Sequence, residues 1–329
     1  MNAKRILIPK EGKAICEEFD YRGIENDDQI GIRTDYSVIS AGTELAIRWG
    51  TESWAKLPYV PGYGSAATVL QVGKNIEGVE VGQRLLCYGP HASHANIAGM
   101  FFPVPDTIDF SSVPLLRMAA VSITAPRVSN AEYGDLVAVV GVGLVGNIAA
   151  QIFNAMGCRV IAIDPSQNRR DKAKELGIKY ALQPSARLKQ EIEETCNALP
   201  STVVDASGIP RVIAQSIELV AQNGEMILLG TPRAEFQSDL QPFLSKVHIA
   251  KFNVQLKGAH EWIYPRQHLE GKHSIPRNIE SIIRSIEDGK VNLRNLISHR
   301  IGPGDIQAAY DGLENNPDEY LGVVIDWTR

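Results

Sequence analysis

Three glycines and one acidic residue form the pattern in this sequence that most directly suggests chemistry. Gly141, Gly143 and Gly146 follow the apolar run Leu136 to Val140, and Asp164 ends the next apolar run along the chain. A strand, a glycine turn, a helix and a second strand with a terminal acid are typical of a nucleotide-binding βαβ unit. In such a unit the glycines allow a tight turn, the approach of backbone amides to a pyrophosphate, and close packing of the helix on the strand. The pattern therefore predicts a dinucleotide site.

The acidic residue also bears on which dinucleotide binds. The carboxylate of Asp164 would accept hydrogen bonds from the adenosine ribose and repel a 2′-phosphate, which favours NAD(H) over NADP(H). Arg169 and Arg170 follow closely, and an arginine near this position can accommodate a 2′-phosphate. We interpret these two arginines as the solvated first turn of a helix over Arg169 to Leu176. The predicted cofactor is therefore NAD.

The overall composition argues against several classes of function. The chain has 329 residues, of which 44% are hydrophobic, and a formal net charge of −5. This length predicts about two domains, and the charge does not favour nucleic-acid or anionic-membrane binding. The first residues lack the apolar core of a signal peptide and no stretch is long enough to span a membrane, so we expect a cytoplasmic protein. The four cysteines form no CxxC pair, which argues against a disulfide framework or a structural zinc lobe.

The pattern of apolar segments changes along the chain. Short alternating segments broken by Gly and Pro fill the N-terminal third and are typical of a β-rich domain. From about residue 120 to 260, strand-like and helical runs alternate, which predicts a doubly wound parallel sheet with a ligand at the carboxyl ends of its strands. The strands expected for this sheet are Leu136 to Val140, Arg159 to Asp164, Tyr180 to Leu182, Thr202 to Asp205, Glu225 to Gly230 and Lys251 to Lys257.

Several short segments together carry a family resemblance. They occur in the order Ser40-Ala-Gly-Thr-Glu44, Pro61-Gly-Tyr-Gly64, Val69-Leu-Gln-Val-Gly73, Val81-Gly82, Gly134-Asp135, the glycine turn, Asp205-Ala-Ser-Gly208 and Leu228-Leu-Gly-Thr-Pro232. In this combination the chain resembles the alcohol dehydrogenase-like medium-chain dehydrogenase/reductase superfamily over essentially its full length.

This resemblance implies an α/β fold in which a Rossmann doubly wound parallel sheet is inserted into a β-rich, GroES-like catalytic domain. We expect the catalytic domain over residues 1–123, completed by 267–329, and the Rossmann domain over 124–266. The resemblance also implies pairing into a homodimer through the edge of the Rossmann sheet. The candidate cofactor-binding residues are Gly141, Gly143, Leu144, Val145, Gly146, Asp164, Arg169, Ser207, Gly230 and Thr231.

The sequence departs from the family where zinc-dependent members bind their catalytic metal. Ala41, Tyr63 and Arg117 stand at the positions that supply the three protein ligands in those enzymes. Alanine has no donor atom, an arginine is not deprotonated in proteins, and tyrosine is an uncommon zinc ligand. A relocated site among the histidines, such as His91 with His94, is the alternative, but no histidine spacing fits a known ligand pattern. We therefore predict a site without metal.

Without zinc, the developing charge on the substrate oxygen has to be handled by side chains. The resemblance places Thr43 at the position of a hydroxyl that relays the substrate proton, and it brings Tyr63 and Arg117 into one pocket. The guanidinium would then lower the pKa of the Tyr63 phenol into a range useful for acid–base catalysis. Alternatively, Tyr63 fills space, and Arg117 pairs with Glu44 or binds a substrate carboxylate or hydroxyl. We expect Glu44 to orient Arg117 or Tyr63.

Three functions are compatible with these features. The first is a zinc-independent oxidoreductase that transfers a hydride between NAD(H) and a secondary alcohol or ketone, such as a polyol or sugar derivative. The second is a quinone or enoyl reductase using NAD(P)H, against which Asp164 counts. The third is a non-catalytic NAD(H)-binding protein, against which the presence of Thr43 and Glu44 counts.

Overall fold

The computed structural model describes residues 1–268 and 271–329, and divides the chain into two units. The first unit comprises Met1–Met118 and Leu293–Arg329, and the second comprises Ala119–Asn292. The first boundary falls inside helix α2 (Leu115–Ser122). In the described part of the chain, no helix is long and apolar enough to cross a membrane.

The second boundary lies further along the chain than the expected residue 267. Helix α9 (Ile275–Glu287) belongs to the second unit, because its polar face is bound there. Arg127 Nε donates to Asn278 Oδ1 at 3.0 Å, and Arg127 Nη2 donates to Ser281 Oγ at 3.1 Å. The sequence pattern alone carries no information about which unit this helix joins.

The first unit is built on a mostly antiparallel sheet and a separate hairpin. The sheet has the order β14-β15-β3-β4-β5-β7, with β6 paired to β3, and only β14 and β15 run parallel. The strands are β1 (Asn2–Lys10), β2 (Lys13–Asp20), β3 (Ile30–Val38), β4 (Ser65–Val72), β5 (Arg84–Cys87), β6 (His94–Ile97), β7 (Phe101–Pro103), β14 (Ile297–Ile301) and β15 (Gly322–Asp326). The predicted β-rich domain is thus present.

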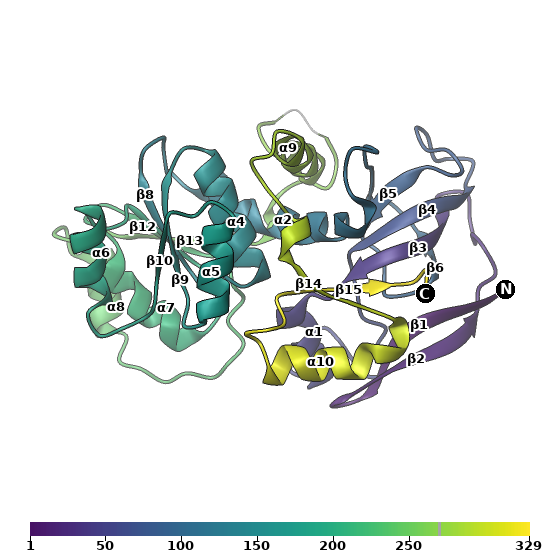
Figure 1. Cartoon of the computed structure of the whole chain (residues 1–329), viewed down its shortest axis with the longest axis horizontal. Coiled ribbons are helices and arrows are strands. Elements are labelled where there is room, and N and C mark those ends of the chain that lie inside the picture. Colours follow the sequence, from purple (N-terminus) through teal and green to yellow (C-terminus); the bar gives the residue numbers. More distant parts are fainter. Residues whose placement is uncertain (269–270) are drawn as a thin grey trace. The chain divides into compact units, whose positions relative to one another are not determined.

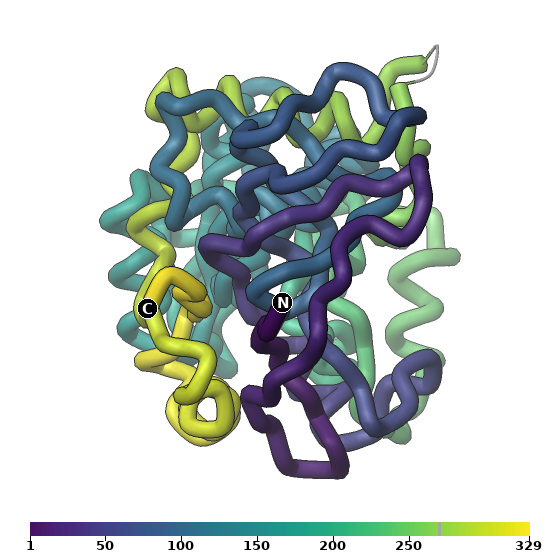
Figure 2. The backbone as a smooth tube through the Cα atoms, turned by 90° about the vertical axis from the view of Figure 1, so that its right-hand side faces the viewer, coloured from purple at the N-terminus to yellow at the C-terminus, as the bar shows by residue number. Residues whose placement is uncertain are grey.

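Residues from both ends of the chain share one core in this unit. Ile6 and Ile8 of the β1–β2 hairpin pack with Ile306 and Tyr310 of helix α10 (Ile306–Asn315) and with Ile325 of β15. Figure 2 shows the hairpin, in purple, beside α10, in yellow. The same core receives Ile47 of helix α1 (Ala41–Arg48), which the sequence analysis did not anticipate. Short 3₁₀ turns complete the unit at Phe110–Ser112, Arg294–Leu296 and Pro303–Asp305.

The second unit contains the predicted parallel sheet. Its strand order is β10-β9-β8-β11-β12-β13, the order of a Rossmann fold. The strands are β8 (Leu136–Val140), β9 (Arg159–Ile163), β10 (Tyr180–Leu182), β11 (Thr202–Asp205), β12 (Glu225–Leu228) and β13 (Gln255–Gly258). The order reverses between β8 and β11, which are paired in register from Val137 with Thr202 to Val140 with Asp205. Ligands of such sheets bind at the carboxyl ends of the strands at this reversal.

Helices cover both faces of this sheet, as the alternation of its side chains requires (Figure 1). Val137 and Val139 of β8 point into a core that includes residues of α3, α4 and α5. Ala138 and Val140 point into the opposite core, which includes residues of α6, α7 and α8. The helices are α3 (Thr124–Val128), α4 (Leu144–Ala155), α5 (Gln167–Glu175), α6 (Leu188–Cys196), α7 (Pro210–Ser216) and α8 (Gln241–His248), with 3₁₀ turns at Ile217–Leu219 and Glu261–Ile263. This arrangement is the fold expected from the sequence.

Candidate active site and cofactor site

The glycine turn joins β8 to α4 at the reversal of strand order. Gly141 has a φ of +85°, a left-handed conformation that favours glycine. A Cβ at Gly146 would lie 1.9 Å from the carbonyl oxygen of Gly141, so only glycine permits this approach of helix and turn. At Gly143, a Cβ would come no closer than 3.7 Å to another side chain, which leaves the entrance to the turn open. The three glycines therefore have the separate structural properties that a pyrophosphate-binding turn needs.

The start of α4 presents backbone donors beside this turn. Gly143 is its N-cap residue, and within the described chain no side chain caps the helix there. The amides of Leu144, Val145 and Gly146 belong to the first turn of the helix, where backbone N–H groups lack carbonyl partners of their own helix. Such a terminus, with its positive helix dipole, suits a phosphate group.

The loops after β11 and β12 approach the turn from the other side. A Cβ on Gly141 would lie 2.9 Å from the amide nitrogen of Ser207, and one on Gly230 would lie 2.4 Å from that of Gly208. Asp205, which the sequence analysis did not select, organises these loops. Its Oδ1 accepts from Ser207 Oγ at 2.6 Å, and its backbone oxygen accepts from Gly230 N at 2.9 Å. Burial raises the pKa of this carboxyl, and the hydrogen bonds from Ser207 and Gly208 oppose that effect.

Asp164 is more deeply engaged in the protein than a simple ribose ligand would be. Its side chain is buried, Oδ2 accepts from Val142 N at 2.9 Å, and Oδ1 accepts from Ser166 N at 2.9 Å. Each carboxylate oxygen has a second lone pair for a ribose hydroxyl. Arg169 Nη1 lies 3.8 Å from Oδ2. A cation and an anion therefore lie together near the expected position of the adenosine ribose, where NAD(H) has a 2′-hydroxyl and NADP(H) has a 2′-phosphate.

The interpretation of both arginines as a solvated turn is wrong for Arg170. This side chain is 6% exposed, and its Nη1 donates to the backbone oxygens of Asp164 at 2.6 Å and Pro165 at 2.8 Å. It therefore fixes the loop after β9 rather than facing solvent. The helix begins two residues earlier than expected, at Gln167, because Ser166 caps it.

These residues fit a nicotinamide dinucleotide. Backbone amides at the start of α4 would hold its pyrophosphate, and Asp164 or Arg169 would meet its adenosine ribose. Ser207, Gly230 and Thr231 lie in the loops after β11 and β12, at the carboxyl edge where such a ligand binds. When bound, the nicotinamide supplies or accepts a hydride.

In the first unit, the structure brings Tyr63, Thr43 and Arg117 together. The Tyr63 hydroxyl donates to Ser40 Oγ and lies 3.4 Å from Thr43 Oγ1. The guanidinium carbon of Arg117 lies 4.8 Å from the centroid of the Tyr63 ring and 4.3 Å from that of Tyr88. Arg117 is buried, and its cation lies between two aromatic rings. Neither Ser40 nor Tyr88 was selected from the sequence.

The predicted lowering of the Tyr63 pKa is wrong. Burial raises the pKa of this phenol, and this effect outweighs the hydrogen bonds with Ser40 and Thr43 and the charge of Arg117, which all lower it. The Glu44 carboxylate adds a smaller effect in the raising direction. Tyr63 is therefore a neutral hydroxyl at physiological pH, with a proton to donate.

Glu44 has different partners from those expected. Its Oε2 accepts from Tyr310 Oη at 2.7 Å and contacts His91 Nε2 at 3.0 Å, and its Oε1 accepts from Ser40 N at 2.7 Å. Because a carboxylate only accepts hydrogen bonds, this contact assigns the proton of His91 to Nε2. Glu44 thus holds the start of α1 and a buried histidine, rather than orienting Arg117 or Tyr63 through a hydrogen bond.

Glu44, His91 and Tyr310 are buried together, and their network continues to the C-terminus. His91 Nδ1 lies 2.8 Å from Ser37 Oγ, which also accepts from Trp327 Nε1 at 3.0 Å. Burial and the Glu44 carboxylate raise the pKa of Tyr310 well above its ordinary value. The sequence offered no signal for this network, because its members lie on distant segments.

The side chains at the three positions that the family resemblance assigns to zinc ligands are of types that do not suit this metal. Ala41 offers a methyl group, Tyr63 a phenol hydrogen-bonded to Ser40, and Arg117 a cation. Zinc prefers thiolate, imidazole and carboxylate ligands. Within residues 1–268 and 271–329, no group of three or more His, Cys, Asp or Glu side chains is arranged to hold a metal ion.

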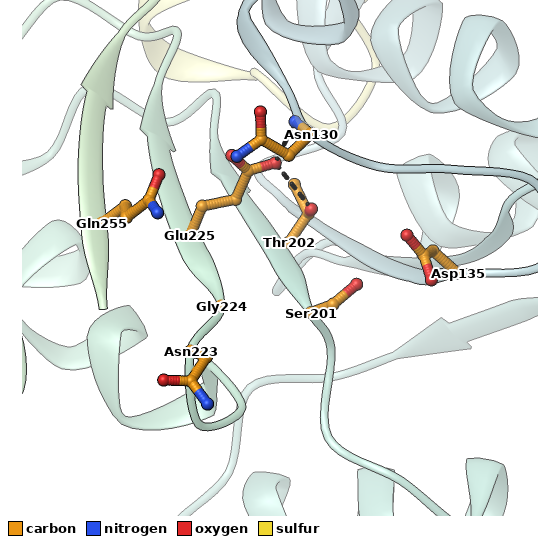
Figure 3. A pocket seen from close by; sticks show the side chains of 8 residues that line it. All are labelled: Asn130, Asp135, Ser201, Thr202, Asn223, Gly224, Glu225 and Gln255. Atoms are coloured by element: carbon orange, nitrogen blue, oxygen red, sulfur yellow. Dashed lines mark hydrogen bonds between the residues drawn. The ribbon is translucent and has the colours of Figure 1, made fainter. Parts of the chain in front are cut away.

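A cavity of about 150 Å³ lies at the opposite, amino-terminal edge of the parallel sheet (Figure 3). Glu225, at the start of β12, accepts from Ser129 Oγ at 2.6 Å and Thr202 Oγ1 at 2.9 Å, and pairs with Lys257 Nζ at 2.5 Å. Figure 3 shows the hydrogen bonds from Thr202 Oγ1 and from the backbone nitrogen of Asn130 to this carboxylate. The cavity is therefore the rim of a structural ion-pair network, away from the glycine turn at the carboxyl edge.

Comparison with known proteins agrees with this architecture. Residues 145–262 match the family described as zinc-binding dehydrogenase. Among solved structures, galactitol-1-phosphate dehydrogenase from Escherichia coli has a TM-score of 0.84 at 17% identity, with 98% of this chain and 99% of that chain covered. Two further structures of this fold contain a cofactor. An alcohol dehydrogenase from Escherichia coli, at TM-score 0.83, 16% identity and 99% coverage of both chains, is complexed with NADH. A zinc-binding dehydrogenase from Sinorhizobium meliloti, at TM-score 0.82, 16% identity and 99% coverage of both chains, is bound to NADP.

Sequence relatives point to the same group. L-galactonate-5-dehydrogenase from Escherichia coli is 22% identical, with 98% of this chain and 99% of the relative covered. Alcohol dehydrogenase from Geobacillus stearothermophilus is 26% identical over 55% of this chain, and the match spans 63% of that relative. Residues 145–262 thus match a dehydrogenase family, the whole chain has the fold of alcohol dehydrogenase-like proteins, and these relatives are named as dehydrogenases.

Proposed function

We propose that this protein is an NAD(H)-dependent oxidoreductase that interconverts a secondary alcohol and a ketone without zinc. The observation that carries this proposal is the cluster of Tyr63, Ser40, Thr43 and Arg117, in which Tyr63 and Arg117 stand at positions that the family resemblance assigns to zinc ligands. A buried, neutral phenol is a proton donor, and general acid catalysis typically contributes roughly 10²- to 10⁴-fold.

Carbonyl reduction is the direction that uses this phenol directly. A bound NADH would supply the hydride for the carbonyl carbon of the substrate, and Tyr63 would give its proton to the carbonyl oxygen. The buried Arg117 cation near the ring favours the phenolate that remains. In the opposite direction, the phenolate would have to form first, which its raised pKa disfavours at neutral pH.

The substrate class proposed is a polyol or sugar derivative. Support comes from relatives named as dehydrogenases of L-galactonate and galactitol 1-phosphate. We also propose NAD(H) rather than NADP(H), because the Asp164 charge opposes a 2′-phosphate. The Arg169 cation, whose Nη1 lies 3.8 Å from that carboxylate, instead favours a 2′-phosphate and therefore NADP(H).

The test is a panel of ketoses, keto acids and sugar phosphates assayed for NADH oxidation, with the reverse reaction assayed on the corresponding alcohols. Reduction of a ketone by NADH supports the proposal. Turnover confined to quinones or enones with NADPH would assign the protein to the quinone or enoyl reductases. Tight NADH binding with no turnover of either set would favour a cofactor-binding protein without catalysis.

We further propose a homodimer formed through β13, the outer strand of the parallel sheet. Its residues are largely exposed, including Leu256 at 45%, and an outer strand offers backbone groups to a second copy. Light scattering on the wild type and on Leu256→Lys tests this. We expect a dimer that dissociates in the variant, whereas a wild-type monomer would contradict the proposal.

A further inference from the structure

Ser40 occupies the N-cap position of α1 but does not cap it. A serine at this position ordinarily accepts a hydrogen bond from an amide in the first turn. Ser274 does so for α9, where its side chain accepts from Arg277 N at 3.3 Å. For α1, no capping bond from the Ser40 side chain occurs in the described structure. The Ser40 hydroxyl is instead directed to Tyr63.

The backbone around Ser40 is fixed independently of its side chain. Ser40 N donates to Glu44 Oε1 at 2.7 Å, and Glu44 N donates to the Ser40 carbonyl oxygen at 2.8 Å. Glu44 is held in turn by Tyr310 and His91. The Ser40 hydroxyl is therefore presented from a rigid point, and its removal leaves the turn with its other hydrogen bonds.

The groups that face the Tyr63 phenol come from two helices. From α1 these are Ser40, Thr43 and the Glu44 carboxylate, and from α2 the Arg117 cation. Thr43 Oγ1, at 3.4 Å, is near the limit of hydrogen-bond length. Glu44 is committed to its own network and acts on Tyr63 only through its charge. Ser40 is thus the hydroxyl that holds the phenol oxygen in place.

We propose that Ser40 is a positioning residue for proton donation by Tyr63. In the resting state it accepts the hydrogen bond of the phenol. When the Tyr63 proton passes to the carbonyl oxygen of the substrate, the Ser40 hydroxyl rotates and donates to the phenolate oxygen. No covalent bond of Ser40 forms or breaks, and the proton of its hydroxyl stays on Oγ. The role of Ser40 in catalysis rests on the proposed carbonyl reduction, whereas the contact between Ser40 and Tyr63 does not.

The experiment compares Ser40→Ala and Ser40→Thr with the matched cap variant Ser274→Ala. Ser274→Ala removes a true cap, so its thermal midpoint should fall more than that of Ser40→Ala. With a ketone that the wild type reduces, Ser40→Ala should lower kcat by roughly ten- to a hundredfold, the range for a hydrogen bond to a charged group. KM should change little, and Ser40→Thr should restore most of kcat.

A second readout does not depend on turnover. Tyrosinate absorbance after a rapid pH jump, taken as the difference from Tyr63→Phe, reports the ionisation of Tyr63 alone. Ser40→Ala should move this ionisation to higher pH, and Ser40→Thr should move it less. An unchanged ionisation in Ser40→Ala, or a loss of stability equal to that of Ser274→Ala, would overturn the inference. Full activity of Tyr63→Phe would instead refute the acid role of Tyr63 and leave the Ser40 contact to be judged by the titration.

Discussion

The guanidinium of Arg117 lies over the ring of Tyr63, with its central carbon 4.8 Å from the ring centroid. The cation therefore meets the π-face of the ring, and a second ring, that of Tyr88, contacts it at 4.3 Å. The charge of Arg117 lowers the phenol pKa less than burial raises it. The position of Tyr63 beside Arg117 in the sequence-based alignment suggested an activated phenolate. Its burial in the folded protein instead keeps the phenol protonated, so that it can act as an acid.

Tyr63→Phe should lower kcat for ketone reduction by roughly 10²- to 10⁴-fold with little change in NADH affinity, because only the hydroxyl is removed. Tyr36→Phe, which removes a phenol elsewhere in the same unit, is the matched control. In the wild type, the acid form persists above the ordinary tyrosine pKa of about 10, so the rate should fall only at still higher pH. Arg117→Met should shift this decrease in rate to still higher pH, because it removes a charge that lowers the pKa of Tyr63. A rate that declines near neutrality would contradict this assignment.

Removing the centre of the buried network should be costly. Glu44→Ala leaves His91 Nε2, Tyr310 Oη and Ser40 N without their acceptor, and each buried unsatisfied group costs about 1–3 kcal/mol. Tyr310→Phe removes one donor and leaves the carboxylate its other two, so it should cost about 1 kcal/mol. Urea unfolding of both variants measures this. Equal losses would show that the network is not centred on Glu44.

The parallel sheet should contribute an acid-sensitive part of the stability. Burial alone would raise the pKa of Glu225, but hydrogen bonds from Lys257, Ser129, Asn130 and Thr202 lower it below its ordinary value. A lowered folded pKa means that this stabilisation is present above the unfolded value of about 4.3 and is lost as the pH falls through the folded pKa. Glu225→Gln should cost about 2 kcal/mol at pH 7. The difference in the free energy of unfolding between Glu225→Gln and the wild type should become smaller at acidic pH. A difference that becomes larger at acidic pH would contradict this assignment.

Cofactor preference should respond to the two charges at the end of β9. Asp164→Asn keeps an acceptor for one of the amides of Val142 and Ser166 while it removes the charge, so the ratio of NADH to NADPH affinity should fall. Arg169→Ala should weaken NADPH binding more than NADH binding. Fluorescence titration of both reduced cofactors measures the ratios. Tighter binding of NADPH than NADH by the wild type would reverse the assignment.

The parts of this protein that follow from local pattern were predictable. The βαβ unit required a strand, a glycine turn and an acid in sequence, and β8, β10 and β11 have the expected bounds. Thr43 and Glu44 were expected in the site, but the helix that carries them was not, because a Ser-Ala-Gly-Thr sequence carries no apolar periodicity. The partners of Glu44 could not be found, since Tyr310 comes from the far end of the chain. The pKa of Tyr63 depends on burial, which one sequence does not give.

The central claim is hydride chemistry without zinc, and metal content measured together with activity tests it most directly. Protein dialysed against a chelator should contain far less than stoichiometric zinc by elemental analysis, because Ala41, Tyr63 and Arg117 supply no suitable ligand set. It should also reduce its ketone substrate with NADH at the rate measured before dialysis. A stoichiometric zinc ion whose removal abolishes turnover would contradict the account.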